Sequence, residues 1–187
     1  MFIQTEVTPN PQSLKFISEK KLLDKGSLEF KTKEEAESLN LAKKLFELDS
    51  VVNVFISESF VTITKKPGID WEVIKPSILA KIMECLSSGK VIKNKIKNNN
   101  KKLKKKYTKK NENIVKQIED LLDKRIKPAV AQDGGDIKFV KYEKGIVFLE
   151  MRGACAGCPS STMTLKAGIE NMLKYYVPEI VSVEAIN

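Results

Sequence analysis

A lysine-rich tract near the middle of the chain limits how large any folded part can be. Between Lys90 and Lys110 the sequence KVIKNKIKNNNKKLKKKYTKK holds eleven lysines and no acidic residue. Like charges repel one another, and asparagine favours turns, so this tract predicts a flexible linker. With 187 residues in total, we expect two small domains, residues 1–89 and 112–187, joined by a Lys/Asn-rich linker over residues 90–111.

The same tract accounts for the basic character of the chain. Without its eleven positive charges, the net charge of +9 becomes −2, so the two folded parts are slightly acidic. A lysine tract can bind phosphate non-specifically. However, Tyr107 is its one aromatic residue, whereas single-strand binders interleave several stacking side chains. We therefore expect a solvated linker and no nucleic-acid partner, with a basic nucleic-acid-binding module kept as an alternative.

The first domain mixes predicted strands and helices. Residues 13–17 and 27–30 are expected to be short strands, and residues 51–56 and 60–64 a hairpin. Apolar residues at helical spacing predict one helix from Lys33 to Leu48 and another after Trp71. Cys85 lies on the apolar face of that last helix, and free cysteine packs like a small hydrophobe. We interpret it as a core residue and not as a ligand.

The second domain is expected to follow the order helix, strand, strand, cysteine loop, helix, strand. Its first helix carries an apolar stripe up to Ile126, with Pro128 just beyond its end. Asp133-Gly134-Gly135-Asp136 predicts a tight turn into a strand, and Glu143-Lys144-Gly145 predicts a reversal into the next one. A helix is expected to begin at Pro159, and Pro178 to end it. Both domains are therefore predicted to be small mixed α/β domains, which makes the fold class α+β.

Two of the three cysteines lie in the run Gly153-Ala154-Cys155-Ala156-Gly157-Cys158-Pro159-Ser160-Ser161, and the chain has no histidine. The absence of histidine excludes mixed Cys/His zinc sites and Cys–His or Ser–His catalytic pairs. Cys155 and Cys158 are thus the candidate metal ligands. They supply half of the four thiolates that an iron–sulfur cluster or a structural zinc normally takes, so two copies of the chain should meet at this loop.

The surroundings of the cysteines favour a metal site over two other interpretations. We expect the N-terminus of the following helix to lower the pKa of the thiols and Arg152 to face solvent. A thioredoxin-like dithiol is an alternative, but few elements precede the motif and no tryptophan adjoins it. Inert packing is another, but glycines flank both cysteines in a polar loop.

The composition also suggests a cellular setting. No apolar run approaches the roughly 18 residues of a membrane span, and the sequence after Met1 has neither a signal-peptide pattern nor an arginine-rich presequence. Three cysteines do not make a disulfide scaffold. We expect a reducing, cytoplasmic setting and no membrane partner.

These motifs resemble a known family. Asp133-Gly134-Gly135-Asp136-Ile137 and the cysteine run are similar to the NifU C-terminal-type domain. Further motifs resemble the N-terminal domain of Nfu proteins, namely Thr8-Pro9-Asn10-Pro11-Gln12-Ser13-Leu14-Lys15-Phe16, Phe60-Val61-Thr62-Ile63-Thr64-Lys65 and Asp70-Trp71. The resemblance covers nearly the whole chain except the linker, which is unusually long and lysine-rich here.

The resemblance implies a non-enzymatic iron–sulfur scaffold or carrier. Such a protein holds a [4Fe–4S] cluster between the two subunits of a homodimer, with Cys155 and Cys158 as ligands, and passes it to apo iron–sulfur proteins. Upstream cluster assembly proteins are further expected partners. A [2Fe–2S] cluster or zinc in a structural zinc-bridged dimer would satisfy the same ligand count and stays open.

Overall fold

The computed structural model describes residues 2–88, 107, 109–156 and 159–186. The chain divides into two compact units, one N-terminal and one C-terminal. Each contains a β-sheet and helices, which confirms the α+β fold class. Most of the predicted linker over residues 90–111 lies outside the described residues. Within its described part, Tyr107 packs against the core of the C-terminal unit, and a helix begins at Lys109.

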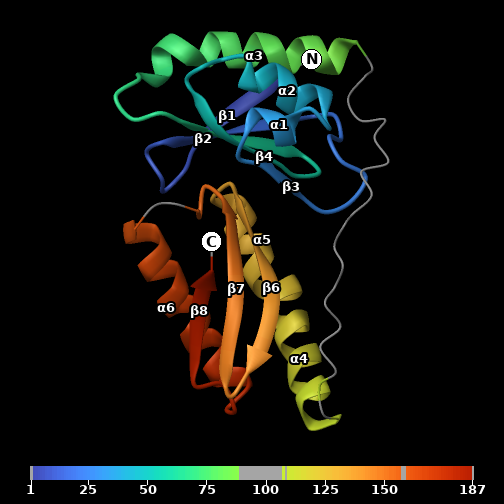
Figure 1. The fold of residues 1–187 in the computed structure, drawn as a ribbon, viewed down its shortest axis with the longest axis vertical. Helices are drawn as coiled ribbons and strands as arrows, with labels where there is room; N and C mark the ends of the chain where they lie inside the picture. Colours follow the sequence, from blue (N-terminus) through green and yellow to red (C-terminus); the bar gives the residue numbers. More distant parts are fainter. Residues whose placement is uncertain (1, 89–106, 108, 157–158, 187) are drawn as a thin grey trace. The chain divides into compact units, whose positions relative to one another are not determined.

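The N-terminal unit is built on a five-stranded antiparallel sheet in the order β1-β2-β5-β4-β3. Its strands are β1 (Ile3–Val7), β2 (Ser13–Ser18), β3 (Leu28–Phe30), β4 (Val51–Ile56) and β5 (Phe60–Lys65). Its helices are α1 (Lys33–Ala36), α2 (Asn40–Phe46) and α3 (Trp71–Ser87). The helices cover one face of the sheet (Figure 1), and the residues that meet there form the apolar core.

Two features of this unit differ from the sequence prediction. The edge strand β1 was not expected. The predicted helix from Lys33 to Leu48 is split into α1 and α2, because Leu39 adopts an extended conformation and is fully buried. Pro76 lies inside α3, and Asp70 caps the first turn of this helix.

The C-terminal unit has a three-stranded sheet in the order β6-β7-β8. Its strands are β6 (Gly135–Glu143), β7 (Ile146–Gly153) and β8 (Ser182–Ile186). The strands β6 and β7 pair antiparallel, whereas β8 runs parallel to β7 after the helix α6 (Pro159–Tyr176). The order of elements matches the prediction, and α6 begins at Pro159 as expected.

A continuous helical rod precedes β6. It consists of α4 (Lys109–Leu121), a π-helical turn η1 (Leu122–Ile126) and α5 (Lys127–Gln132). The expectation that this helix ends before Pro128 is therefore wrong. In α-helical winding the ring of Pro128 would press on the carbonyl of Lys124, and the wider π turn immediately before it relieves this contact.

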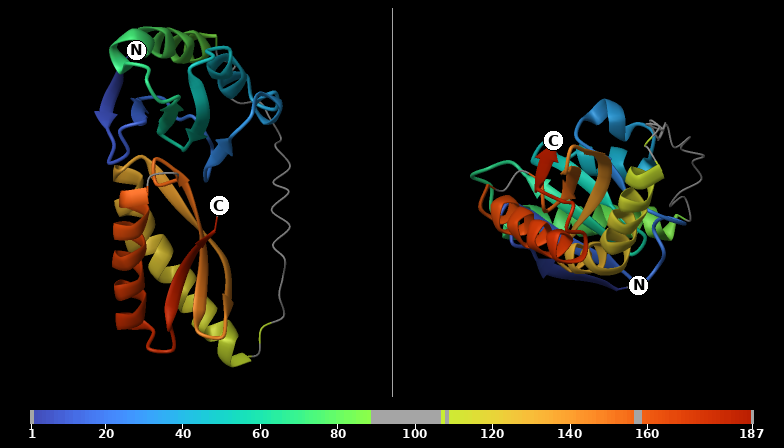
Figure 2. Two further views of the ribbon diagram at one scale, coloured as in Figure 1. Left: turned by 60° about the vertical axis from the view of Figure 1, so that its left-hand side comes forward. Right: turned by 90° about the horizontal axis from the view of Figure 1, so that it is seen from below.

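The rod and α6 pack against the same face of the sheet (Figure 2) and enclose the second core. Alternate residues of β7 are buried, including Val147, Leu149 and Met151, which is the period expected of a strand with one covered face.

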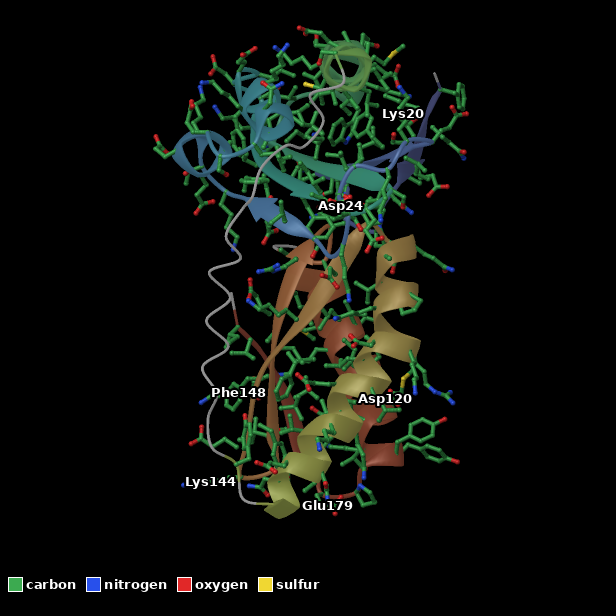
Figure 3. The ribbon with its side chains drawn as sticks, turned by 90° about the vertical axis from the view of Figure 1, so that its right-hand side faces the viewer. Lys20, Asp24, Asp120, Lys144, Phe148 and Glu179 are labelled. Carbon is green, nitrogen blue, oxygen red and sulfur yellow. The ribbon has the colours of Figure 1, made fainter. Side chains whose placement is uncertain are left out.

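The strands β6 and β7 are joined by a two-residue turn, Lys144 and Gly145, both with positive φ. This is the hairpin geometry that follows the right-handed twist of the strands. Lys144 lies at the same end of the unit as Glu179 (Figure 3). The strand β7 runs away from this end, so the cysteine loop that follows Gly153 lies at the opposite end.

Candidate metal centre

The Asp133–Asp136 turn and the start of the cysteine loop lie side by side at one end of the sheet. Gly135 pairs with Gly153, and Asp136 with Arg152, across β6 and β7. The N–H of Ala154 donates to the carbonyl of Gly134 at 3.2 Å. Gly134 has a φ of +80°, which lets the chain leave α5 and enter β6 directly. The two sequence motifs therefore form one structural site.

Cys155 is buried at this site. Its residue is 5% exposed, and its side chain joins the apolar core of the C-terminal unit. The backbone of Gly135 lies directly beside the thiol: a Cβ atom on Gly135 would come within 2.5 Å of Cys155 Sγ. Sequence reasoning missed this contact. The signal that could have indicated it is the second glycine of the turn, because the turn itself needs only one.

The electrostatics around Cys155 are the reverse of the expected ones. Burial, followed by the negative charges of Asp133 and Asp136, raises the pKa of the Cys155 thiol to about 12. The prediction that the helix N-terminus lowers this pKa is wrong for the cluster-free protein. Removal from water disfavours the thiolate more strongly than a helix end favours it. The thiol is thus protonated at neutral pH, and a metal ion must displace its proton on binding.

Arg152 does not face solvent freely, contrary to our expectation. Its Nε donates to Glu150 Oε1 at 2.9 Å, and its side chain is 19% exposed. Lys138 approaches the other oxygen of Glu150 at 3.6 Å. Arg152 and Lys138 together lower the pKa of Glu150 against the opposing effect of its burial. The positive charge of Arg152 is therefore engaged by Glu150 on the sheet.

Of the other two cysteines, Cys85 lies among the described residues and Cys158 does not. Cys158 lies outside the described residues, so its position relative to Cys155 stays a prediction. Cys85 is 1% exposed within the core of the N-terminal unit, which confirms its interpretation as a core residue. Burial raises the pKa of the Cys85 thiol. Cys85 is therefore a core residue of the N-terminal unit and not part of the cysteine loop.

Neither a cluster of metal-binding side chains nor a membrane-spanning helix occurs among the described residues. In residues 2–88, 107, 109–156 and 159–186, no group of three or more His, Cys, Asp or Glu side chains is arranged to hold a metal ion. None of the helices in these ranges has the length and apolar character needed to cross a membrane.

Comparison with protein families matches both units. Residues 3–89 match the model described as "Scaffold protein Nfu/NifU N terminal", and residues 118–184 match the "NifU-like domain". The solution NMR structure of a NifU-like protein from Saccharomyces cerevisiae is 30% identical, with a TM-score of 0.46 over 50% of this chain and 85% of that one.

Curated relatives extend over the whole sequence. The Drosophila sechellia protein named "NFU1 iron-sulfur cluster scaffold homolog, mitochondrial" is 44% identical over 187 residues, 100% of this chain and 65% of that protein. The protein of the same name from Drosophila grimshawi is 44% identical over 186 residues, 99% of this chain and 61% of that protein. The chain thus spans less than two thirds of the length of these relatives.

These names correct one expectation. The relatives are named mitochondrial, which contradicts the cytoplasmic setting inferred from the composition. Composition and cysteine usage reflect a reducing compartment, and this property does not separate the cytoplasm from the mitochondrial interior. With both family models matched in order and relatives aligned along the full sequence, the chain belongs to the Nfu/NifU-like family of iron–sulfur cluster scaffold proteins.

Proposed function

We propose that this chain is a carrier, not an enzyme, that holds a [4Fe–4S] cluster between two subunits and delivers it to apo-proteins. Cys155 and Cys158 of each subunit would supply the four thiolate ligands. The cluster is cargo, received from upstream assembly proteins and passed on. The chain spans less than two thirds of the length of its relatives, so the activity and partners of the whole protein are part of this proposal.

The observation that carries the proposal is the placement of Cys155. It lies at the junction of β7 and α6, at the end of the unit opposite the Lys144–Gly145 turn. The only other cysteine of the C-terminal unit is Cys158, since Cys85 lies in the core of the N-terminal unit. Two thiols leave a four-ligand sphere half filled, so a second subunit must complete it.

The same ligand count explains release. Each subunit holds the cluster through two bonds, so separation of the subunits, or entry of thiolates from a target protein, replaces its ligands stepwise. Such lability suits delivery better than long-lived electron transfer.

The role of the N-terminal unit is part of the proposal. Its one cysteine is buried in its core, so it would contribute no thiolate to the cluster. We assign it to the recognition of partner proteins or to the folding of the chain, as the family resemblance implies.

Anaerobic reconstitution tests the proposal. The purified chain should take up about two irons and two sulfides per subunit, with the Mössbauer spectrum of a [4Fe–4S] cluster and the mass of a dimer by light scattering. A zinc-bridged dimer would instead be colourless, with about one zinc per two subunits. Cys155→Ser and Cys158→Ser should each abolish stable loading, whereas the matched control Cys85→Ala should load normally. A monomer that keeps a full cluster would refute the proposal.

A further inference from the structure

The contact between Gly135 and Cys155 has a consequence for how the ligand thiol is presented. We infer that the lack of a side chain at Gly135 allows the Cys155 side chain to take a retracted position in the cluster-free protein, and that cluster loading requires this side chain to leave the core. The second part rests on the proposed function. The first part concerns the cluster-free chain and stands on its own contacts.

Gly135 leaves room for the sulfur and for little else. An added Cβ would lie 2.5 Å from Cys155 Sγ, 3.2 Å from Cys155 Cβ and 2.7 Å from the carbonyl oxygen of Arg152. Non-bonded carbon atoms normally stay about 3.5–4.0 Å apart. The sulfur and the Arg152 carbonyl oxygen therefore both occupy space that a side chain at position 135 would fill.

The backbone conformation does not explain this glycine. Gly134 has a φ of +80°, in the region that favours glycine, but Gly135 is not among the residues with positive φ. Since Gly135 begins β6 with ordinary strand geometry, another residue could adopt its backbone angles. The reason for a glycine here is spatial, and the nearest atom is the thiol of Cys155.

The retracted position is incompatible with a shared cluster. With 5% of its surface exposed and its side chain within the apolar core, Cys155 offers its sulfur little access from outside the subunit. A cluster held between two subunits must contact each sulfur at the surface. The Cys155 side chain must therefore turn outward when the cluster binds.

Two backbone hydrogen bonds connect the start of the loop to the end of the hairpin. The N–H of Ala154 donates to the Gly134 carbonyl at 3.2 Å, and the N–H of Ala156 donates to the Gly153 carbonyl at 3.1 Å. Both lie at the end of the hairpin, where opening costs less than in the middle of a sheet. Retraction would shield the Cys155 thiol from oxidants and unwanted metals until a donor protein delivers the cluster.

Thiol alkylation tests the inference directly. In the full chain carrying Cys158→Ser, iodoacetamide labelling of Cys155 is followed by peptide mass spectrometry at fixed pH, with buried Cys85 as an internal reference. Cys155 should react at least about tenfold more slowly in the folded chain than in urea. Gly135→Ala should speed its labelling about tenfold in the folded chain by displacing the sulfur. Gly168→Ala is the matched control, because an added Cβ there meets nothing within 4 Å, and it should leave the rate unchanged.

Two results would overturn the inference: equal labelling of Cys155 in the folded and unfolded chains, or a folded Gly135→Ala chain that labels no faster. If Gly135→Ala lowers the free energy of unfolding, Cys155→Ala added to it should recover the part due to the sulfur, while the part due to the Arg152 carbonyl oxygen, 2.7 Å from the added Cβ, remains. No recovery would mean that the Arg152 carbonyl, and not the thiol, excludes a side chain, and would refute the role of Gly135. If the Cys158→Ser chain shields Cys155 but the chain with Cys158 intact takes up no cluster, the proposed function is refuted while the retracted thiol stands.

Discussion

The carboxylate of Glu170 in α6 accepts a hydrogen bond from the backbone N–H of Val183 in β8 at 2.9 Å, while its other oxygen lies 2.6 Å from Lys174 Nζ. Val183 is fully buried, so this carboxylate satisfies a donor that water does not reach. The contact joins the helix that follows the cysteine loop to the last strand of the unit.

We expect this contact to make the C-terminal unit sensitive to acid. The bonds from Lys174 and Val183 lower the pKa of Glu170 below its ordinary value of 4.5. Its contribution to stability is therefore complete above pH 4.5 and is lost as the pH falls through the lower, folded-state pKa. Urea unfolding at a series of pH values should show that Glu170→Ala costs about 1 kcal/mol at pH 7 and less in acid. Glu112→Ala, an exposed site in α4, is the control. An equal cost for Glu170→Ala at pH 7 and pH 3 would contradict this prediction.

Gly145 should be intolerant of a side chain for two separable reasons. Its φ is +82°, and an added Cβ would lie 2.7 Å from Val181 Cγ2. Gly145→Ala should lower the free energy of unfolding by roughly 2–3 kcal/mol, from backbone strain together with overpacking. Gly68→Ala has a similar φ of +79° with nothing within 4 Å, and should cost about 1 kcal/mol. Adding Val181→Ala should recover part of the Gly145→Ala loss, and no recovery would argue against the steric contact.

Asp70 is expected to stabilise the N-terminal unit as a helix cap. Its side chain accepts a hydrogen bond from the N–H of Glu72 at 3.1 Å, at the first turn of α3. Asp70→Ala should lower the unfolding free energy by about 1 kcal/mol, whereas Asp70→Asn keeps an acceptor and should cost less. Chemical denaturation followed by the fluorescence of Trp71, the only tryptophan, reports on this helix. Equal losses for both variants would exclude the capping role.

Cys85 should contribute to the stability of the fold and not to iron binding. It is 1% exposed and lies on the apolar face of α3, within the core of the N-terminal unit. Cys85→Ala should reduce the unfolding free energy by roughly 1 kcal/mol through the cavity it leaves, with iron and sulfide per subunit unchanged. Denaturation and metal analysis of the same preparation check both halves, and a loss of iron would reassign this cysteine.

The elements that could be predicted from the sequence are those with a local signal. The Lys144–Gly145 reversal needs positive φ at two positions, and Pro159 fits the first turn of α6, so both were identified. The edge strand β1 was missed because it presents no apolar face: Ile3 packs against the core, but Val7 is 87% exposed. The helical rod around Pro128 was missed because proline normally ends a helix, and only tertiary packing selects the π turn that accommodates it.

The candidate site, like the fold, could be predicted only in part from the sequence. The pairing of two cysteines in one loop is visible in the sequence, but the burial of Cys155 depends on Gly135, which lies far from it along the chain. No local pattern reports such a contact or the two carboxylates that raise the pKa of the thiol. The expected direction of that pKa was wrong because burial in the interior of the unit, which no local pattern indicates, disfavours the thiolate.

The π turn at Leu122–Ile126 also fixes the length of the rod. Five residues of a π turn advance around the helix axis about as far as four α-helical residues do. Deleting one residue there would therefore restore regular winding and leave Ile114 and Ile118 facing the sheet. The same deletion would return the ring of Pro128 to the carbonyl four residues before it, so its cost would fall on the proline and not on the apolar stripe.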